Sequence, residues 1–230
     1  MKKKILVIAA HPDDEVLGCG GTLAKAIKAG AMVRVVFLGE GVSARFPFGQ
    51  YKSDEFYSQS KIRMNEAKAA LKVLNIKDFH FGDRLCVQFD TLPHITLVKD
   101  IEKHIDDFKP TILLTHNSSE VNIDHRLTYE AVEAACRPTG KESLPEEIYT
   151  FEIICSGSYK FHPFFSPNVF VDISDTWDLK VKAWKCYEKE SRAFPFSRST
   201  ESLETLAMYR GLSSGMKRVE AFSLARMLVR

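Results

Sequence analysis

Short, almost purely apolar runs are the feature that most constrains the fold of this chain. Residues 4–8, 32–38 and 110–116 each hold such a run, rich in branched side chains and too brief for a buried helix. Runs of this kind predict strands covered on both faces, as in a parallel sheet. The residues between the first two runs have helical spacing and stop near Gly30. Strand, helix and strand in this order predict a right-handed parallel unit.

The same alternation continues along most of the chain. We expect helices over residues 16–29, 60–74, 92–108, 125–136, 175–190 and 199–210, and further strands over 78–81, 148–155 and 168–173. Residues 138–140 break the fourth helix, and residues 219–229 are apolar without a clear period. A long polar and aromatic loop after the second strand, reaching about Ser58, is a candidate for a binding role.

No linker rich in Pro, Gly or Ser divides the chain. The sequence therefore predicts an α/β fold: a single Rossmann-like domain over residues 1–230, with a mostly parallel sheet and helices on both faces.

Acids and histidines follow two of the expected strands directly. His11, Asp13 and Asp14 come after the first strand, and the polar loop after the fourth strand leads to Asp124 and His125. Ligands bind outside the carboxyl ends of strands in open α/β sheets, and these two strands are commonly neighbours. Two imidazoles and one carboxylate are a common ligand set for catalytic zinc. A further carboxylate beside the metal can move a proton.

A simpler interpretation assigns these residues to structure alone. Acids at the start of a helix usually cap it or face its dipole, and a lone histidine at a strand end is more often structural. The metal site is favoured because both clusters fall at carboxyl strand ends and because Asp13, Asp14 and Glu15 exceed what one cap requires. Glu15 is expected to cap the helix or to support its neighbours.

Composition narrows the classes of function. The chain has 32 basic and 30 acidic residues without a dense basic run, which argues against nucleic-acid binding. No segment approaches the ~20 apolar residues of a membrane span, and the apolar run at the start is too brief for a signal peptide. Five irregularly spaced cysteines suit a reducing compartment. We expect a cytoplasmic protein without an integral membrane segment. The sequence leaves open whether the protein forms a homo-oligomer.

Several motifs together resemble one family. Ala-His-Pro-Asp-Asp-Glu at residues 10–15, with Gly-Cys-Gly-Gly at 18–21, is similar to the first motif of the PIG-L/LmbE-like zinc-dependent N-deacetylases. Residues 124–126, Asp-His-Arg, resemble the second metal motif of that family. Weaker similarities lie at Gly39-Glu40, at Arg63 with Glu66, and at Glu220-Ala221-Phe222. The resemblance spans nearly the whole chain.

The resemblance implies a Zn²⁺ ion held by His11, Asp14 and His125, with Asp13 as general base and later general acid. The implied reaction removes an N-acetyl group from a small-molecule amino sugar or sugar conjugate of the N-acetylglucosamine type. It releases acetate and a free amine.

The resemblance also implies substrate contacts. Arg63 is expected to bind the polar side of the sugar, and Glu40 is taken as a second substrate-binding residue. The structural alternative for Arg63 is a surface ion pair with Glu66, which contributes little stability.

The chain departs from the family pattern at one position. Asn122 stands where the family often has a histidine that helps to stabilise the oxyanion. An asparagine can donate a neutral hydrogen bond there, so Asn122 and Asp124 are kept as catalytic candidates. Asp124, without that histidine, is free to hold His125 or an arginine. His116 is either structural or a substitute donor.

The sequence also leaves other interpretations of the function open. The substrate could be a thiol-sugar conjugate or an acylated antibiotic precursor, and a non-catalytic Rossmann-like nucleotide-binding protein is the alternative from another class. The aromatic segments at 161–165 and 194–196 either wall a sugar pocket or pack in loops. Arg84, Arg137, Arg192 and Arg198 lie in or beside loops, and the sequence does not say which of them faces the site.

Overall fold

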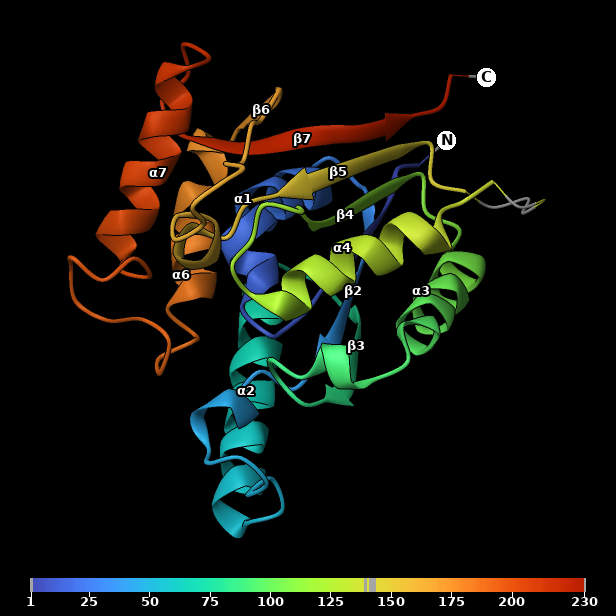
Figure 1. Ribbon diagram of the computed structural model, residues 1–230. Coiled ribbons are helices and arrows are strands. Elements are labelled where there is room, and N and C mark those ends of the chain that lie inside the picture. Colours follow the sequence, from blue (N-terminus) through green and yellow to red (C-terminus); the bar gives the residue numbers. More distant parts are fainter. Residues whose placement is uncertain (1, 139, 141–143, 230) are drawn as a thin grey trace.

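The structure is a computed structural model that describes residues 2–138, 140 and 144–229. In this part of the chain, seven strands form one sheet in the order β3-β2-β1-β4-β5-β7-β6 (Figure 1). The strands are β1 (Lys4–Ala9), β2 (Met32–Gly39), β3 (Asp78–Arg84), β4 (Ile112–His116), β5 (Glu147–Phe151), β6 (Val169–Asp172) and β7 (Val219–Met227).

Helices connect most of these strands. They are α1 (Asp14–Lys28), α2 (Asp54–Val73), α3 (His94–Phe108), α4 (Ile123–Ala135), α5 (Ile154–Gly157), α6 (Trp177–Trp184) and α7 (Thr200–Leu212), with 3-10 turns η1 (Ser43–Arg45), η2 (Phe89–Thr91) and η3 (Ser174–Thr176).

The central strand β1 pairs in parallel with both β2 and β4. The prediction that the first and fourth strands are adjacent in the sheet is therefore confirmed. Pairing remains parallel from β3 to β5, and β7 then runs antiparallel to both β5 and β6. The fold is a single α/β domain with a mostly parallel sheet, as the sequence predicts. Its parallel strands bring their carboxyl ends to one edge, where the candidate site lies.

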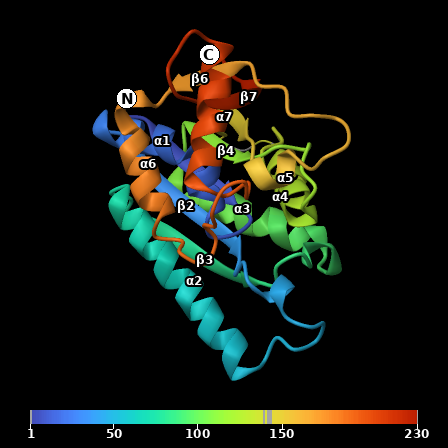
Figure 2. The same ribbon diagram turned by 90° about the vertical axis from the view of Figure 1, so that its left-hand side faces the viewer.

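Apolar cores form on both faces of the sheet. Ile5 and Val7 of β1 belong to the core that also contains residues of α1, α2, α6 and α7. The alternate residues Leu6 and Ile8 belong to the core beneath α3 and α4. This alternation follows from the strand's two-residue period, and it explains why β1 is apolar throughout. Figure 2 shows α2, α6 and α7 on the first of these faces.

Some element boundaries differ from the predictions. The helix expected from Val16 begins two residues earlier, at Asp14, because α1 includes two of the acids that follow β1. The helix expected from residue 60 begins at Asp54, since the Ser53 side chain accepts a hydrogen bond from the Phe56 amide and caps it. These earlier starts shorten the preceding loops.

The later part of the chain differs more. The strand expected over 148–155 ends at Phe151 and gives way to α5, and the helix expected over 175–190 is only α6, Trp177–Trp184. Residues 219–227 form β7, whose first four residues are buried. The expected break over residues 138–140 falls partly outside the described residues. No described helix is long and apolar enough to cross a membrane.

Candidate active site

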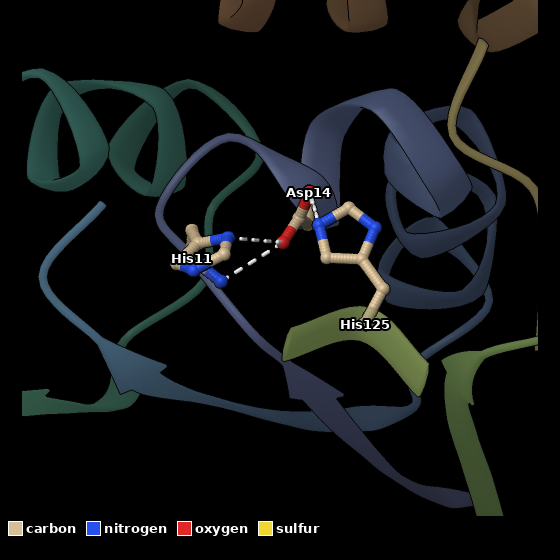
Figure 3. A group of neighbouring side chains, drawn as sticks. All are labelled: His11, Asp14 and His125. Carbon is tan, nitrogen blue, oxygen red and sulfur yellow. Dashed lines mark hydrogen bonds and ion pairs between the residues drawn. The ribbon is translucent and has the colours of Figure 1, made fainter. Parts of the chain in front are cut away.

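His11, Asp14 and His125 meet at the carboxyl edge of the sheet (Figure 3). One ligand atom from each lies within 4.8 Å of the others. Asp14 sits between the rings: its Oδ1 is 3.5 Å from His125 Nε2, and its Oδ2 is 3.7 Å from His11 Nδ1. All three residues are at most 5% exposed. The three residues expected to hold a metal are therefore together, although their role as ligands stays a prediction.

A buried carboxylate orients His11 from behind. Oδ2 of Asp124 lies 2.8 Å from His11 Nε2, and the carboxylate also accepts hydrogen bonds from the amides of Val87 and Phe89. Because a carboxylate accepts, Nε2 carries the ring proton and the Nδ1 lone pair faces Asp14. The expectation that Asp124 holds His125 or an arginine is wrong. Its partner is His11, because β1 and the start of α4 meet side by side.

His125 has its own carboxylate, which sequence reasoning missed. Glu120 Oε2 lies 3.4 Å from His125 Nδ1, so His125 Nε2 is the nitrogen that faces Asp14. Burial lowers the pKa of His125 to about 4, which leaves a neutral imidazole able to bind a metal. Burial also raises the pKa of Glu120 to about 7. The only sequence signal for Glu120 was its place in the polar loop before His125.

Asp13 occupies a strained backbone position beside Asp14. Its φ of 121° lies in the region that disfavours residues with a side chain. The Asp13 amide donates to Glu15 Oε2, and Arg63 Nη1 donates to the Pro12 carbonyl, so both sides of the turn are held. Burial raises the pKa of Asp13 above its usual value, an effect that Arg198 and Arg63 partly offset. A buried carboxylate of this kind is a stronger base than an exposed one.

Glu15 stabilises the turn at Asp13 by accepting the hydrogen bond from the Asp13 amide, and it does not act as a charged cap of α1. Its second oxygen accepts a 2.6 Å hydrogen bond from the Tyr187 hydroxyl. The residue is fully buried, and burial raises its pKa to about 8. Glu15 thus links α1 to the segment after α6.

Arg63 does not lie on the surface. It is 2% exposed, and its guanidinium contacts Asp13 Oδ2 at 3.2 Å and the buried carboxylate of Glu190. Glu66 also lies 3.4 Å from Arg63 Nε, so the expected pair exists but is buried. The surface interpretation is wrong because α2 turns this face toward the segment after α6. The predicted contact of Arg63 with substrate stays a prediction.

The described contact of the Asn122 side chain is structural, whereas His116 also contacts a candidate metal ligand, since its Nε2 lies 3.3 Å from Asp14 Oδ2. The Asn122 side-chain oxygen accepts from the Asp124 amide and caps α4. His116 Nε2 accepts from the Ala10 amide at 3.0 Å, and its ring stacks on His125 with centroids 4.0 Å apart. His116 Nδ1 is buried and has no hydrogen-bond partner among the described residues. A role for either residue at the oxyanion stays a prediction.

Glu40 orders the loop after β2. Its carboxylate accepts hydrogen bonds from the amides of Val42, Ser43 and Cys86. These contacts join the loop after β2 to the loop after β3. Its predicted substrate contact is untested.

Of the four loop arginines, Arg198 reaches the site. Its Nη1 lies 3.1 Å from Asp13 Oδ2. Arg84 instead pairs with Asp100, Arg137 donates to the Ala134 carbonyl, and Arg192 lies over the ring of Phe196. Phe161, Phe164 and Phe194 are strongly exposed, so these parts of the aromatic segments are not packed in a core.

The donor set fits a zinc ion. Two imidazole nitrogens and one carboxylate oxygen converge, a set that suits Zn²⁺. Each histidine has a carboxylate on its other nitrogen, the arrangement that fixes tautomer and ring orientation in metal sites. Asp13 adds a carboxylate next to the group. The cluster His11, Cys86 and Asp124 also has three close ligand atoms, but Asp124 there is already occupied by two backbone amides.

Comparisons with known proteins identify the family of the chain. The sequence profile of the PIG-L family (GlcNAc-PI de-N-acetylase) matches residues 6–136, which carry His11, Asp14 and His125. The diacetylchitobiose deacetylase of Thermococcus kodakarensis is 31% identical over 230 residues, covering 95% of this chain and 81% of that protein. The 4-oxalmesaconate hydratase of Pseudomonas putida is 26% identical, covering 99% of this chain and 86% of the hydratase.

A solved structure of N,N'-diacetylchitobiose deacetylase from Pyrococcus horikoshii superposes with a TM-score of 0.75 at 25% identity, covering 96% of this chain and 83% of that one. The profile match covers more than half of the 230 residues, and the first of these relatives aligns along nearly the whole chain. The chain therefore belongs to the PIG-L family of N-deacetylases, which are hydrolases acting on amide bonds.

Proposed function

We propose that this protein is a zinc-dependent hydrolase that removes the N-acetyl group from an amino sugar or sugar conjugate of the N-acetylglucosamine type. The observation that carries the proposal is the buried triad His11, Asp14 and His125 with the Asp13 carboxylate beside it. The diacetylchitobiose deacetylases to which the chain is similar act on such a substrate by name.

The proposed roles follow from the contacts. His11 Nδ1, Asp14 and His125 Nε2 would hold the zinc ion, and Asp124 and Glu120 orient the two rings through their other nitrogens. A zinc ion bound there supplies Lewis acidity to the amide carbonyl and makes a nearby water easier to deprotonate. Asp13 accepts the proton of that water and returns it to the leaving amine. Its raised pKa suits both halves of this proton transfer.

A hydratase activity is the second candidate, because the hydratase from Pseudomonas putida is similar over 99% of this chain. Both reactions need an activated water, but the hydratase adds it to a substrate without breaking an amide. Assays for acetate release and for water addition to 4-oxalmesaconate therefore separate the two.

The decisive experiment measures acetate release from N-acetylglucosamine derivatives, starting with N,N'-diacetylchitobiose. We expect turnover with about one zinc per chain and its loss on chelation. Asp13→Asn should retain zinc and reduce kcat by at least about 10²-fold, the usual range for a lost general base.

Asp106→Asn is the matched control, because Asp106 is an exposed acid on α3, away from the triad. It should leave turnover unchanged. Wild-type activity without metal, or full turnover by zinc-loaded Asp13→Asn, would contradict the proposal.

A further inference from the structure

Two residues from the C-terminal third of the chain lie beside the proposed general base: Arg198 contacts the Asp13 carboxylate, and Glu190 contacts Arg198. Glu190 follows α6, and Arg198 precedes α7; both lie outside the part matched by the family profile. We propose that Arg198 and Glu190, together with Arg63, are positioning residues that clamp the Asp13 carboxylate in its reactive orientation. The inference rests on the proposed function only in assigning proton transfer to Asp13.

Both arginines bind the same oxygen of Asp13. Arg63 Nη1 lies 3.2 Å and Arg198 Nη1 3.1 Å from Oδ2. Two charged donors on one oxygen restrict rotation of the carboxylate about its Cβ–Cγ bond. They also leave the other oxygen, Oδ1, as the one to exchange a proton with water or amine. The clamp therefore selects which oxygen acts.

Glu190 holds the two arginines together. It is 4% exposed, its Oε1 contacts Arg63, and its Oε2 lies 2.5 Å from Arg198 Nη1. Arg45, which is half exposed, reaches the same carboxylate from the loop after β2. Arg63 and Arg198 must lie close together because both contact Asp13 Oδ2. Without the negative charge of Glu190, the two guanidinium groups would repel each other at this distance. Glu190 thus sets the geometry of the clamp without touching Asp13.

Arg198 is fixed by a further contact. Its Nε donates to Cys155 Sγ at 2.9 Å, so three groups on separate segments surround the guanidinium. Three carboxylates and three guanidinium groups meet here: Asp13, Glu66 and Glu190 against Arg45, Arg63 and Arg198. Buried ionic groups often stabilise a fold less than apolar residues would. Their concentration on the strained Asp13 turn favours a role in positioning over a role in stability.

The first test compares Arg198→Ala with Arg192→Ala in the zinc-loaded enzyme. Arg192 is exposed in the same loop and lies over Phe196, so it controls for loss of an arginine from this segment. We expect Arg198→Ala to lower kcat by about 10–100-fold, the scale of a misplaced catalytic group. KM should stay within about threefold and zinc content should be unchanged, while Arg192→Ala resembles wild type.

Added guanidinium should raise the kcat of Arg198→Ala by at least about threefold. Removal of the arginine side chain leaves a partly open space beside Asp13 that guanidinium can enter. Glu190→Gln should lower kcat in the same direction, with no rescue by guanidinium. An unchanged kcat, or a rise in KM alone, would overturn the clamp and assign Arg198 to substrate binding.

A second test needs no activity and so separates failure of this inference from failure of the proposed function. A double-mutant cycle combines Asp13→Asn with Arg198→Ala in the zinc-free protein and follows the thermal unfolding midpoint. We expect the shift caused by Arg198→Ala to fall by at least half in the Asp13→Asn background, because the contact partner has lost its charge. Additive shifts would show that the two side chains are not coupled, and the clamp would be rejected.

Discussion

Asp124 and Glu120 each contact one histidine of the site through the nitrogen that faces away from Asp14. These contacts decide the tautomers: His11 presents Nδ1 and His125 presents Nε2 to the same carboxylate. Such outer carboxylates commonly contribute 10–100-fold to metal affinity. Each of the two histidines is thus paired with a carboxylate of its own, and the site is more than three isolated ligands.

Replacing Asp124 tests this pairing directly. Asp124→Asn keeps one oxygen, which can accept from the Val87 or the Phe89 amide but not from both, and it loses the charge beside His11. We expect zinc affinity to fall by about 10–100-fold, measured by competition with a chromogenic chelator. Asp100→Asn serves as control, since Asp100 pairs with Arg84 away from the triad. Equal zinc affinity of both variants would remove Asp124 from the metal site.

At the scale of elements, the close approach of α1 to the sheet positions Asp13 and Asp14. Gly18 allows this approach, because a Cβ there would lie 2.4 Å from Cδ2 of Phe151. The Phe151 ring is buried and lies 4.9 Å from the His116 ring, which stacks on His125. Two ring contacts, Phe151 with His116 and His116 with His125, therefore connect α1 to the site.

A pair of substitutions within α1 checks this argument. Gly18→Ala overpacks the helix against Phe151 and should reduce the free energy of unfolding by about 1–3 kcal/mol. Gly20→Ala meets only Val16 and Lys180 side chains at 3.4 Å or more, so it should be neutral or stabilise by up to about 1 kcal/mol. Urea denaturation of both variants measures the difference. If the two glycines behave alike, the tight contact at Gly18 is not limiting.

At the scale of the whole molecule, one buried carboxylate joins the two ends of the chain. Glu220 on β7 accepts hydrogen bonds from the amides of Gly21 and Thr22 in α1 and pairs with Lys180 of α6 at 2.5 Å. Lys180 also donates to the Leu17 carbonyl of α1. The C-terminal strand thereby holds the helix that begins at the candidate metal site.

Loss of this carboxylate should destabilise the entire fold. Glu220→Ala leaves Lys180 buried without its counter-ion, and we expect a loss of about 3–5 kcal/mol in the free energy of unfolding. Calorimetry should then show a much lower unfolding midpoint. Glu204→Ala removes a more exposed pair with Arg218 and should cost no more than about 1 kcal/mol. Similar losses in the two variants would argue against a special role for Glu220.

The α/β class and the adjacency of the first and fourth strands follow from the sequence alone, because apolar runs indicate buried strands. The same patterns place histidines and acids after two of these strands. The choice of His11, Asp14 and His125 among them came from the resemblance to the PIG-L motifs. The end of β5 at Phe151 was harder to predict, because the largely apolar residues 148–155 have no period that separates a strand from a short helix.

Only the tertiary structure decided what surrounds the triad. Asp124 pairs with His11 across 113 residues, and Arg198 pairs with Asp13 across 185. Neither contact leaves a local pattern, because it arises when packed helices and a closed sheet bring distant side chains to one edge. The surface ion pair that was the structural alternative for Arg63 was wrong for the same reason: helical spacing gives the face on which Arg63 lies, but not what covers that face.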